Sequence, residues 1–471
     1  MDPFFAYPLV LLGAGIVLLF VLIIYLRVNA FVALIVTALL VGLASPRVIL
    51  VTPADATTPR LALAEVPTKV AFEFGSLMGR IGLVIAFATI IGRALMDSGA
   101  ADRIVRFFTR LFGEKLAPLA LLASGFVLSI PVFFDTVFFL LVPLAKVLRL
   151  RTGMNYLLYV MAIGAGGAVT HSLVPPTPGP LTMAATLHVD LGLLILMGVV
   201  VGLPVSLAGF GYAMLANRLW PVPLRQVGQT SLEEMEKEAQ RPDSELPSLS
   251  ASLLPIVLPV ILIASATFFK SVSDRNASWN EGVLVAGTEV TPLGLLEFLG
   301  NPNVALLLAA GVALLLVAYR KRMSRSELAT FSASALEEAA MILLITCAGG
   351  SFGAMLKAVG VGDVLRDLSR EWGIGILFLA WGLAALFKIA QGSGTVSMIS
   401  TAEIVAGIVG VGLLSATPQA SAVLGYHPVY LVLAIGCGSL VGSWMNDSGF
   451  WVVGKMSGMT EKETFRSWTL T

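Results

Sequence analysis

Charged residues are scarce in this sequence. Asp, Glu, Lys and Arg make up 13% of the 471 residues, whereas a typical soluble domain contains about 25%. The 30 Lys and Arg residues almost cancel the 29 Asp and Glu residues, so the net charge is only +1. The chain therefore lacks the strongly basic surface that a nucleic-acid-binding protein needs, and we expect no nucleic-acid partner.

Cysteine and histidine are scarce as well. The two cysteines, Cys347 and Cys437, are far apart, and the chain has only three histidines. This spacing excludes a disulfide framework and gives no set of zinc ligands. We therefore expect neither a metal site nor a cofactor.

Long apolar runs are abundant instead. Hydrophobic residues make up 57% of the chain, and a helix needs about 20 apolar residues to cross the hydrocarbon core of a bilayer. The runs without any charged residue are Pro8–Leu26, Val28–Ala44, Leu191–Ala216, Ala251–Phe269, Asn303–Ala318 and Pro428–Asn446. Since backbone groups inside lipid must satisfy one another, these runs predict an all-α polytopic membrane protein with the lipid bilayer as its surroundings.

The second half of the sequence repeats the pattern of the first. A shift of 261 residues places Gly92, Leu95, Gly99 and Asp102 on Gly353, Leu356, Gly360 and Asp363. A shift of 272 places Gly164-Ala165-Gly166 on Gly436-Cys437-Gly438. The same order of helix, break, helix and break in both halves predicts an internal repeat.

Interrupted apolar runs predict the shape of each repeat. We expect two inverted-topology repeats, each with a re-entrant helical hairpin and a discontinuous transmembrane helix. The expected boundaries are a first repeat at 1–218 (scaffold helices 8–44, hairpin about 116–148, broken helix about 154–188, extra crossing helix 191–217), a cytoplasmic linker at 219–250, and a second repeat at 251–471 (scaffold helices 251–318, hairpin about 374–415, broken helix about 428–455).

Basic residues orient these repeats. Arg320-Lys321-Arg322 and Arg325 form the strongest positive-inside marker and predict a cytoplasmic loop. Counting helices from this loop places the N-terminus in the periplasm and the C-terminus in the cytoplasm, and it makes the two hairpins enter from opposite sides. Opposed hairpins in inverted repeats are typical of secondary transporters, which bind substrate where the broken helices meet.

The breaks in the first half carry two candidate functional residues. Pro131 interrupts the hairpin because proline removes a backbone donor, and Asp135 follows it in an apolar stretch. A carboxylate at membrane depth is a functional candidate, although Asp135 is also placed to cap the second arm of the hairpin. His171 precedes the second break at Pro175-Pro176; it can relay a proton or bind an anion, or simply bond to a loop.

The breaks in the second half are richer in polar groups. Gln391-Gly392-Ser393-Gly394-Thr395 predicts a sharp turn with exposed amides, followed by a helix whose N-terminus favours an anion. A flexible link is the alternative. Asp447 is the second deep carboxylate, beside Ser443 and Asn446. This cluster is suited to hydroxyl groups, a proton or a sodium ion, or it forms a helix cap at the cytoplasmic surface.

At these breaks the sequence resembles the gluconate permease family, the gluconate:proton symporters of the ion transporter superfamily. The most specific similarity lies in the segments His171-Ser172-Leu173-Val174-Pro175-Pro176-Thr177-Pro178-Gly179-Pro180 and Asn446-Asp447-Ser448-Gly449-Phe450-Trp451. Weaker similarity covers most of 75–211 and 336–471. The family pattern has Glu at the position of Asp135 and His at that of Thr177, so substrate size or proton coupling is expected to differ here.

The resemblance implies proton-coupled uptake of gluconate or a related sugar acid across the bacterial inner membrane by alternating access, in a homodimer and without enzyme activity. A sodium-coupled symporter of glycerate or D-serine is the alternative, followed by an intramembrane enzyme that uses Asp135 and Asp447. The expected proton-coupling residues are Asp135, Asp447 and His171. The expected substrate-binding residues are Pro131, Thr170, His171, Ser172, Gln391, Ser393, Gly394, Thr395, Ser443 and Asn446.

Overall fold

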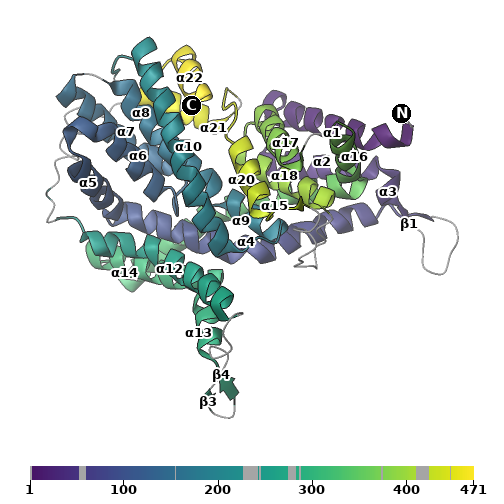
Figure 1. Ribbon diagram of the computed structural model, residues 1–471, viewed down its shortest axis with the longest axis horizontal. Coiled ribbons are helices and arrows are strands. Elements are labelled where there is room, and N and C mark those ends of the chain that lie inside the picture. Colours follow the sequence, from purple (N-terminus) through teal and green to yellow (C-terminus); the bar gives the residue numbers. More distant parts are fainter. Residues whose placement is uncertain are drawn as a thin grey trace. The chain divides into compact units, whose positions relative to one another are not determined.

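The chain is almost entirely helical (Figure 1). The computed structural model describes residues 3–51, 60–153, 155–225, 242, 245–273, 283–285, 288–372, 375–409, 424–445 and 447–471. These residues form two compact units. The first unit comprises Met1–Gly82, Pro178–Val189 and Ala340–Ser448, and the second comprises Leu83–Thr177, Asp190–Ala339 and Gly449–Thr471. Each unit therefore takes segments from both halves of the sequence.

The first unit contains the N-terminal helices and the hairpin of the second half. Its elements are α1 (Pro3–Phe20), which continues as a π-helical turn (Val21–Tyr25), α2 (Ala30–Leu43), α3 (Pro46–Ile49), β1 (Leu50–Val51), β2 (Arg60–Leu61), the first part of α4 (Glu65–Asp97), α9 (Pro178–Thr186), the last part of α15 (Arg325–Val359), α16 (Val361–Trp372), α17 (Ile376–Gln391), α18 (Gly394–Val409) and α20 (Val429–Gly438). Strands β1 and β2 pair antiparallel.

The second unit contains the hairpin of the first half and the helices that follow it. Its elements are the last part of α4, α5 (Ala100–Phe112), a 3-10 turn (Glu114–Leu116), α6 (Ala117–Leu128), α7 (Phe134–Thr152), α8 (Tyr156–Leu173), α10 (Leu191–Leu219), α12 (Leu249–Ser273), β3 (Val283–Val285), β4 (Thr288–Val290), α13 (Pro292–Leu299), α14 (Pro302–Lys321), the first part of α15, α21 (Ser448–Ser457), α22 (Glu461–Ser467) and a last 3-10 turn (Trp468–Leu470).

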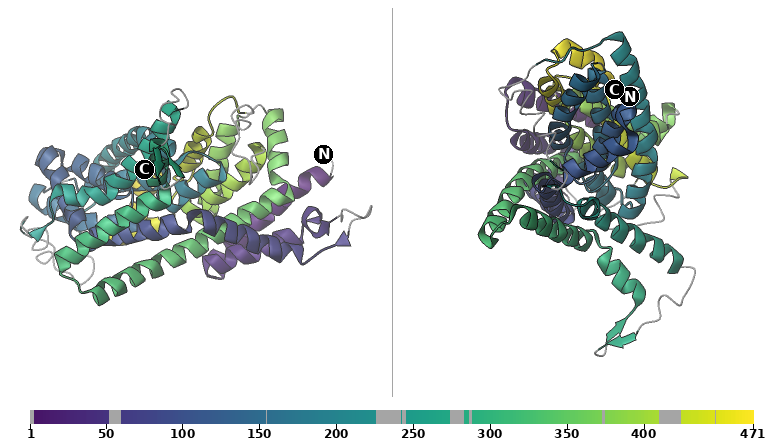
Figure 2. Two further views of the ribbon diagram at one scale, coloured as in Figure 1. Left: turned by 90° about the horizontal axis from the view of Figure 1, so that it is seen from below. Right: turned by 90° about the vertical axis from the view of Figure 1, so that its left-hand side faces the viewer.

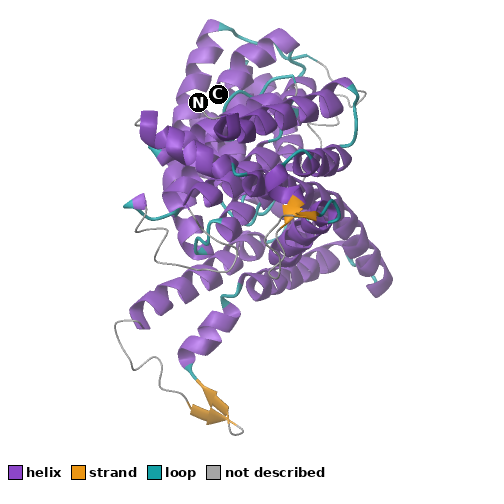
Figure 3. Ribbon diagram, turned by 90° about the vertical axis from the view of Figure 1, so that its right-hand side faces the viewer, coloured by secondary structure: helices purple, strands orange, loops and turns teal. Residues whose placement is uncertain are grey.

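Strands contribute little to either unit. Strands β3 and β4 form a small antiparallel hairpin at the N-terminal end of α13 (Figure 2). Figure 3 shows how few residues are in strands compared with helices. Six of the described helices are long and apolar enough to cross a membrane. The predicted all-α, multi-pass class is therefore confirmed.

The predicted helix breaks are also confirmed. In the first half, α6 ends at Leu128 and α7 begins at Phe134, while α8 ends at Leu173 and α9 begins at Pro178. In the second half, the breaks separate α17 from α18 and α20 from α21. The inverted orientation of the repeats and the sides of the membrane stay predictions, and most of the predicted linker at 219–250 lies outside the described residues.

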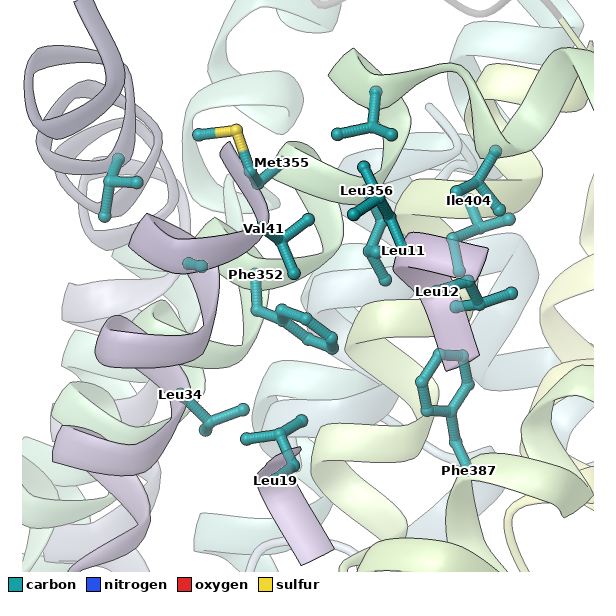
Figure 4. Close-up of a cluster of buried hydrophobic side chains, with 14 of the residues drawn as sticks. Leu11, Leu12, Leu19, Leu34, Val41, Phe352, Met355, Leu356, Phe387 and Ile404 are labelled. Carbon is teal, nitrogen blue, oxygen red and sulfur yellow. The ribbon is translucent and has the colours of Figure 1, made fainter. Parts of the chain in front are cut away.

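A hydrophobic cluster forms the core of the first unit. Helix α2 begins after Asn29, whose side chain accepts a hydrogen bond from the Phe31 amide. Its inner face then packs, with α1, against α15 and the hairpin formed by α17 and α18. Figure 4 shows the buried side chains that meet there, among them Leu11, Leu34, Phe352, Phe387 and Ile404.

Two glycines that the predicted repeat would align, Gly166 and Gly438, allow close helix packing, one in each unit. A Cβ at Gly166 of α8 would lie 2.2 Å from the carbonyl oxygen of Leu122 in α6. A Cβ at Gly438 of α20 would lie 2.3 Å from the carbonyl oxygen of Trp381 in α17. In both units a glycine of the broken helix thus lies directly against the backbone of the first hairpin arm. This is the small-residue packing that membrane helices use.

A salt bridge fastens the C-terminal helix of the second unit. Arg225 donates two hydrogen bonds to the carboxylate of Glu463, at 2.6 and 2.8 Å, and one to the carbonyl of Gly458 at 2.8 Å. Glu463 is also part of a capping box with Thr460 at the start of α22. The hydrogen bonds from Arg225 lower the pKa of Glu463 to about 2.

Replacing either packing glycine should destabilise the protein. In Gly166→Ala and Gly438→Ala the added methyl group meets backbone that cannot rotate away, so we expect a loss of about 1–3 kcal/mol in the free energy of unfolding. Thermal unfolding of the purified protein in detergent measures the effect. Gly211→Ala in α10 is the matched control, because a Cβ there meets nothing within 4 Å; equal melting temperatures in all three variants would contradict close packing.

The salt bridge between Arg225 and Glu463 should weaken in acid. The pKa of Glu463 is lower in the folded state than the ordinary value of 4.5, so its contribution is complete above that value and is lost as the pH falls towards 2. Glu463→Gln should therefore lower the melting temperature at pH 7 and have little effect near pH 2. A difference between variant and wild type that is constant with pH would refute the assignment.

Candidate functional site

The hairpin tip and the helix break of the first half meet in the second unit. Pro131, from the tip between α6 and α7, lines a cleft with Pro175 and Pro176, from the break after α8. The remaining lining side chains are also apolar, and apart from Ile130 of the same tip they come from α4, α10, α12 and α14. Helix α4 also lies close to the hairpin tip, because a Cβ at Gly92 would lie 3.2 Å from the Pro131 carbonyl oxygen. This arrangement brings the two breaks together but offers hydroxylated molecules no polar side chain within the cleft.

Polar groups of the first half lie around these breaks. The ring of His171, in the last turn of α8, packs edge-on against Phe133 of the hairpin tip with a centroid distance of 5.8 Å. The Thr177 hydroxyl donates to the carbonyls of His171 (2.7 Å) and Val174 (3.0 Å). Thr177 therefore ties the two sides of the helix break together through its hydroxyl.

The other predicted residues of the first half have distinct environments. Asp135 is half-buried in the first turn of α7, where the helix dipole favours a negative charge. Thr170 is fully buried, and its hydroxyl donates back to the Gly166 carbonyl at 3.1 Å. Ser172 is buried too. In the hairpin tip, the buried Ser129 hydroxyl has no hydrogen-bond partner among the described residues.

In the second half, a buried ion pair joins the hairpin tip to the helix break within the first unit. The Lys388 ammonium lies 2.6 Å from the Asp447 carboxylate, and the two side chains are 7% and 11% exposed. Lys388 also donates to the Gly392 carbonyl at 2.6 Å, just past the end of α17. Ser443 donates to the same carboxylate oxygen of Asp447. One lysine thus satisfies a helix C-terminus and neutralises the deep carboxylate.

Further hydrogen bonds hold this junction. The Trp444 indole N–H donates to the Ile389 carbonyl at 2.9 Å. The Ser393 hydroxyl accepts a hydrogen bond from the Val396 amide at 3.3 Å, and Ser397 donates to Ala384 at 2.6 Å across the hairpin. The break between α20 and α21 therefore contacts the end of α17 through Trp444 and Asp447.

The sharp turn predicted at this tip is present, and a helix follows it. Gly392 has φ +81°, which is the left-handed conformation that glycine adopts without strain. Gly394 and Thr395 follow as the first residues of α18, where amides have no intrahelical acceptor. Both residues are half-buried. This end of α18 is therefore suited to bind an anion.

Two predicted residues are only partly covered by the structure. Asn446 lies outside the described residues, and for Gln391 the backbone alone is described. Their roles stay predictions. Among the residues that the structure describes, no three His, Cys, Asp or Glu side chains come together as a metal site.

Sequence reasoning missed two buried charged residues in the first unit. Lys388 is the only charged residue of α17, and Glu403 is the only charged residue of α18. Both are nearly inaccessible, at 6% and 5% exposure. A single charge inside an apolar helix is the signal that would have found them.

Comparison with known proteins places this architecture in a family. The family profile described as "GntP family permease" matches residues 7–471. The chain belongs to the GntP permease family. It is therefore a transport protein of the membrane and not an enzyme, as the resemblance at the helix breaks predicted.

Individual GntP permeases match over nearly the whole chain. The "Gluconate permease" of Pseudomonas aeruginosa is 33% identical, over 96% of this chain and 91% of its own length. The "Gnt-II system L-idonate transporter" of Escherichia coli is 30% identical, over 98% of this chain and 95% of its own length. The "High-affinity gluconate transporter" of the same organism is 29% identical, with the same two coverages.

A solved structure shares the fold. The crystal structure of the YdaH transporter of Alcanivorax borkumensis, described as having an unusual topology, has a TM-score of 0.54 to this GntP permease. The alignment covers 96% of this chain and 97% of that one at 13% identity. This likeness supports the predicted fold class.

The Lys388–Asp447 pair should behave as one unit. Lys388→Met or Asp447→Asn alone leaves a buried charge without its partner, and we expect each to cost about 3–5 kcal/mol of stability. The double variant should cost less than the sum, as a double-mutant cycle of thermal unfolding in detergent measures. Lys462→Met, which removes an exposed lysine of α22, is the control. Additive losses in the double variant would show that the two side chains do not interact.

Proposed function

We propose that this GntP permease is a secondary active transporter that carries a small carboxylate together with a proton across the bacterial inner membrane by alternating access. Gluconate or a related sugar acid is the proposed substrate. The names of the relatives support this class of substrate, since two of them are called gluconate transporters or permeases and a third an L-idonate transporter.

The observation that carries the proposal is the junction at the start of α18. The amides of Gly394 and Thr395 provide a partial positive charge for the substrate carboxylate. Ser443 and Asn446 belong to the neighbouring break, and their hydroxyl and amide groups suit the polyol part of a sugar acid. The Lys388–Asp447 pair keeps these breaks in contact while contributing no net charge, so an anion is not repelled.

The breaks of the first half supply a second set of groups. Thr170, His171 and Ser172 end α8, and Pro131 forms the facing hairpin tip. We propose that these residues are a further set of substrate-binding groups, and that a movement of broken helices and hairpins against the remaining helices exposes the substrate to one side of the membrane at a time.

Proton coupling follows from the charge of the cargo. A carboxylate that crosses an apolar barrier carries one negative charge. A proton that the protein binds at the same time compensates this charge in the loaded state. Sodium is the alternative coupling ion, because hydroxyls and carbonyls at helix breaks also suit that ion. We propose a homodimer, as the superfamily resemblance implies.

Uptake by the purified protein in phospholipid vesicles tests this function. An outside pH about two units below the inside pH should drive accumulation of labelled gluconate above equilibrium, since each pH unit supplies about 1.4 kcal/mol. A protonophore should abolish the accumulation, and a sodium gradient at equal pH should not replace it.

Each other result removes a part of the proposal. Accumulation driven by sodium alone would identify a sodium symporter, and equilibration without accumulation would identify a passive pathway. If gluconate and L-idonate fail to enter but glycerate or D-serine enters, the proposed substrate is wrong while the transport mechanism holds.

A further inference from the structure

Glu403 is a carboxylate of the first unit that the proposed substrate site does not use. It lies in the middle of α18, between the apolar residues Ala402 and Ile404, and only 5% of it is exposed. Nine residues separate it from Gly394, which is about 14 Å along a helix. Glu403 is therefore too far from the candidate anion site to contact the same small substrate.

The surroundings of Glu403 are closely fitted to it. The Thr186 hydroxyl, at the end of α9, donates to a carboxylate oxygen of Glu403 at 2.8 Å. On the opposite side, a Cβ at Gly353 of α15 would lie 2.9 Å from the Cβ of Glu403. The absence of a side chain at Gly353 thus makes room for the glutamate. The hydroxyls of Ser400 and Thr401, both fully buried, have no hydrogen-bond partner among the described residues.

Three charged residues act electrostatically on Glu403. They are Lys357 of α15, and Arg80 and Glu73 of α4. Within the described part of the chain, no cationic side chain forms a salt bridge with Glu403. Arg80 is itself incompletely satisfied: its Nε atom is buried without a hydrogen-bond partner among the described residues, while Nη1 donates a hydrogen bond of 3.5 Å to the Ala185 carbonyl.

This environment differs from that of Asp447. Asp447 has a lysine at 2.6 Å, so a proton on Asp447 would leave the buried Lys388 charge without its counter-charge. A proton on Glu403 breaks no salt bridge and removes a charge that burial makes costly. A sodium ion fits less well, because Arg80 and Lys357 repel a cation and Thr186 presents its hydrogen to the carboxylate.

We propose that Glu403 binds the proton that is transported together with the substrate. The inference deepens the proposed function and rests on it. Thr186 belongs to the broken helix of the first half and Glu403 to the hairpin of the second half, so the proton would bind where a broken helix contacts a hairpin.

The positive charge of Arg80 explains how this proton favours an anionic substrate. While Glu403 is ionised, its charge partly compensates that of Arg80; once Glu403 is protonated, the positive potential in this region increases. Proton binding then raises the affinity for the anion. By linkage, anion binding raises the affinity for the proton by the same factor.

Glu403→Gln tests the proposal in the same vesicles, because glutamine keeps the shape of the side chain and cannot release a proton. We expect wild-type protein to accumulate gluconate at least about tenfold under the imposed pH gradient, as one proton per substrate permits. The variant should reach no more than equilibrium, and the pH dependence of its gluconate exchange between pH 5 and about pH 8 should disappear. Glu461→Gln, at an exposed position of α22, is the matched control and should accumulate like wild type.

Accumulation in Glu403→Gln equal to wild type would overturn the proposal and leave the proposed function intact. Loss of accumulation in Asp135→Asn combined with normal accumulation in Glu403→Gln would assign the proton to Asp135 instead. Wild-type protein that does not respond to the pH gradient would refute proton coupling as a whole and this proposal with it.

Glu403→Asp covers the case in which the glutamine variant does not fold. Aspartate keeps the carboxyl group but moves it away from Thr186, so accumulation should persist while the midpoint of the exchange rate against pH moves by about 0.5 unit or more. A midpoint identical to that of wild type would contradict proton binding at this residue. Thr186→Ser is the matched control, because it keeps the hydroxyl donor and should keep the wild-type midpoint.

Discussion

The junction between the two helix breaks of the second half depends on one buried ion pair, Lys388 and Asp447. Lys388 and Asp447 would each be costly in an apolar interior, and together they neutralise one another at 2.6 Å. Because Lys388 lies at the end of α17 and Asp447 in the break before α21, their attraction fixes the place where two interrupted helices meet. It also satisfies the Gly392 carbonyl, which the end of α17 leaves without an intrahelical partner.

The other contacts at the helix breaks supply hydrogen-bond partners for free backbone groups. Every interruption of a membrane helix frees donors and acceptors that lipid cannot satisfy, and the chain supplies local partners for them. Thr177 closes the break of the first half with two hydrogen bonds, while Trp444 and Ser393 do so in the second. The amides of Gly394 and Thr395 lie in the first turn of α18, where they have no intrahelical acceptor, and this is the proposed site of the substrate anion.

The few charges of the chain therefore perform separate tasks. Lys388 and Asp447 hold the junction, and Arg225 and Glu463 fasten the C-terminal helix. The basic clusters at the loops are predicted to orient the helices. Glu403 belongs to none of these pairs, and among the described residues the hydroxyl of Thr186 donates a hydrogen bond to it. A titratable group that is buried without a salt bridge is the kind of group that a proton-coupled transporter requires.

The sequence by itself determined the all-α membrane class, the four helix breaks, the repeated order of elements and the family, because apolar runs, prolines and glycine-rich turns are local signals. It also identified Asp447. Only the tertiary structure decided that Lys388 is the partner of Asp447, 59 positions away, and that Thr186 meets Glu403, 217 positions away. Such pairs depend on which helix faces pack together, and no local pattern encodes that. The glycines show the same limit, since their spacing predicted a repeat while the carbonyls that they approach were visible only in the folded chain.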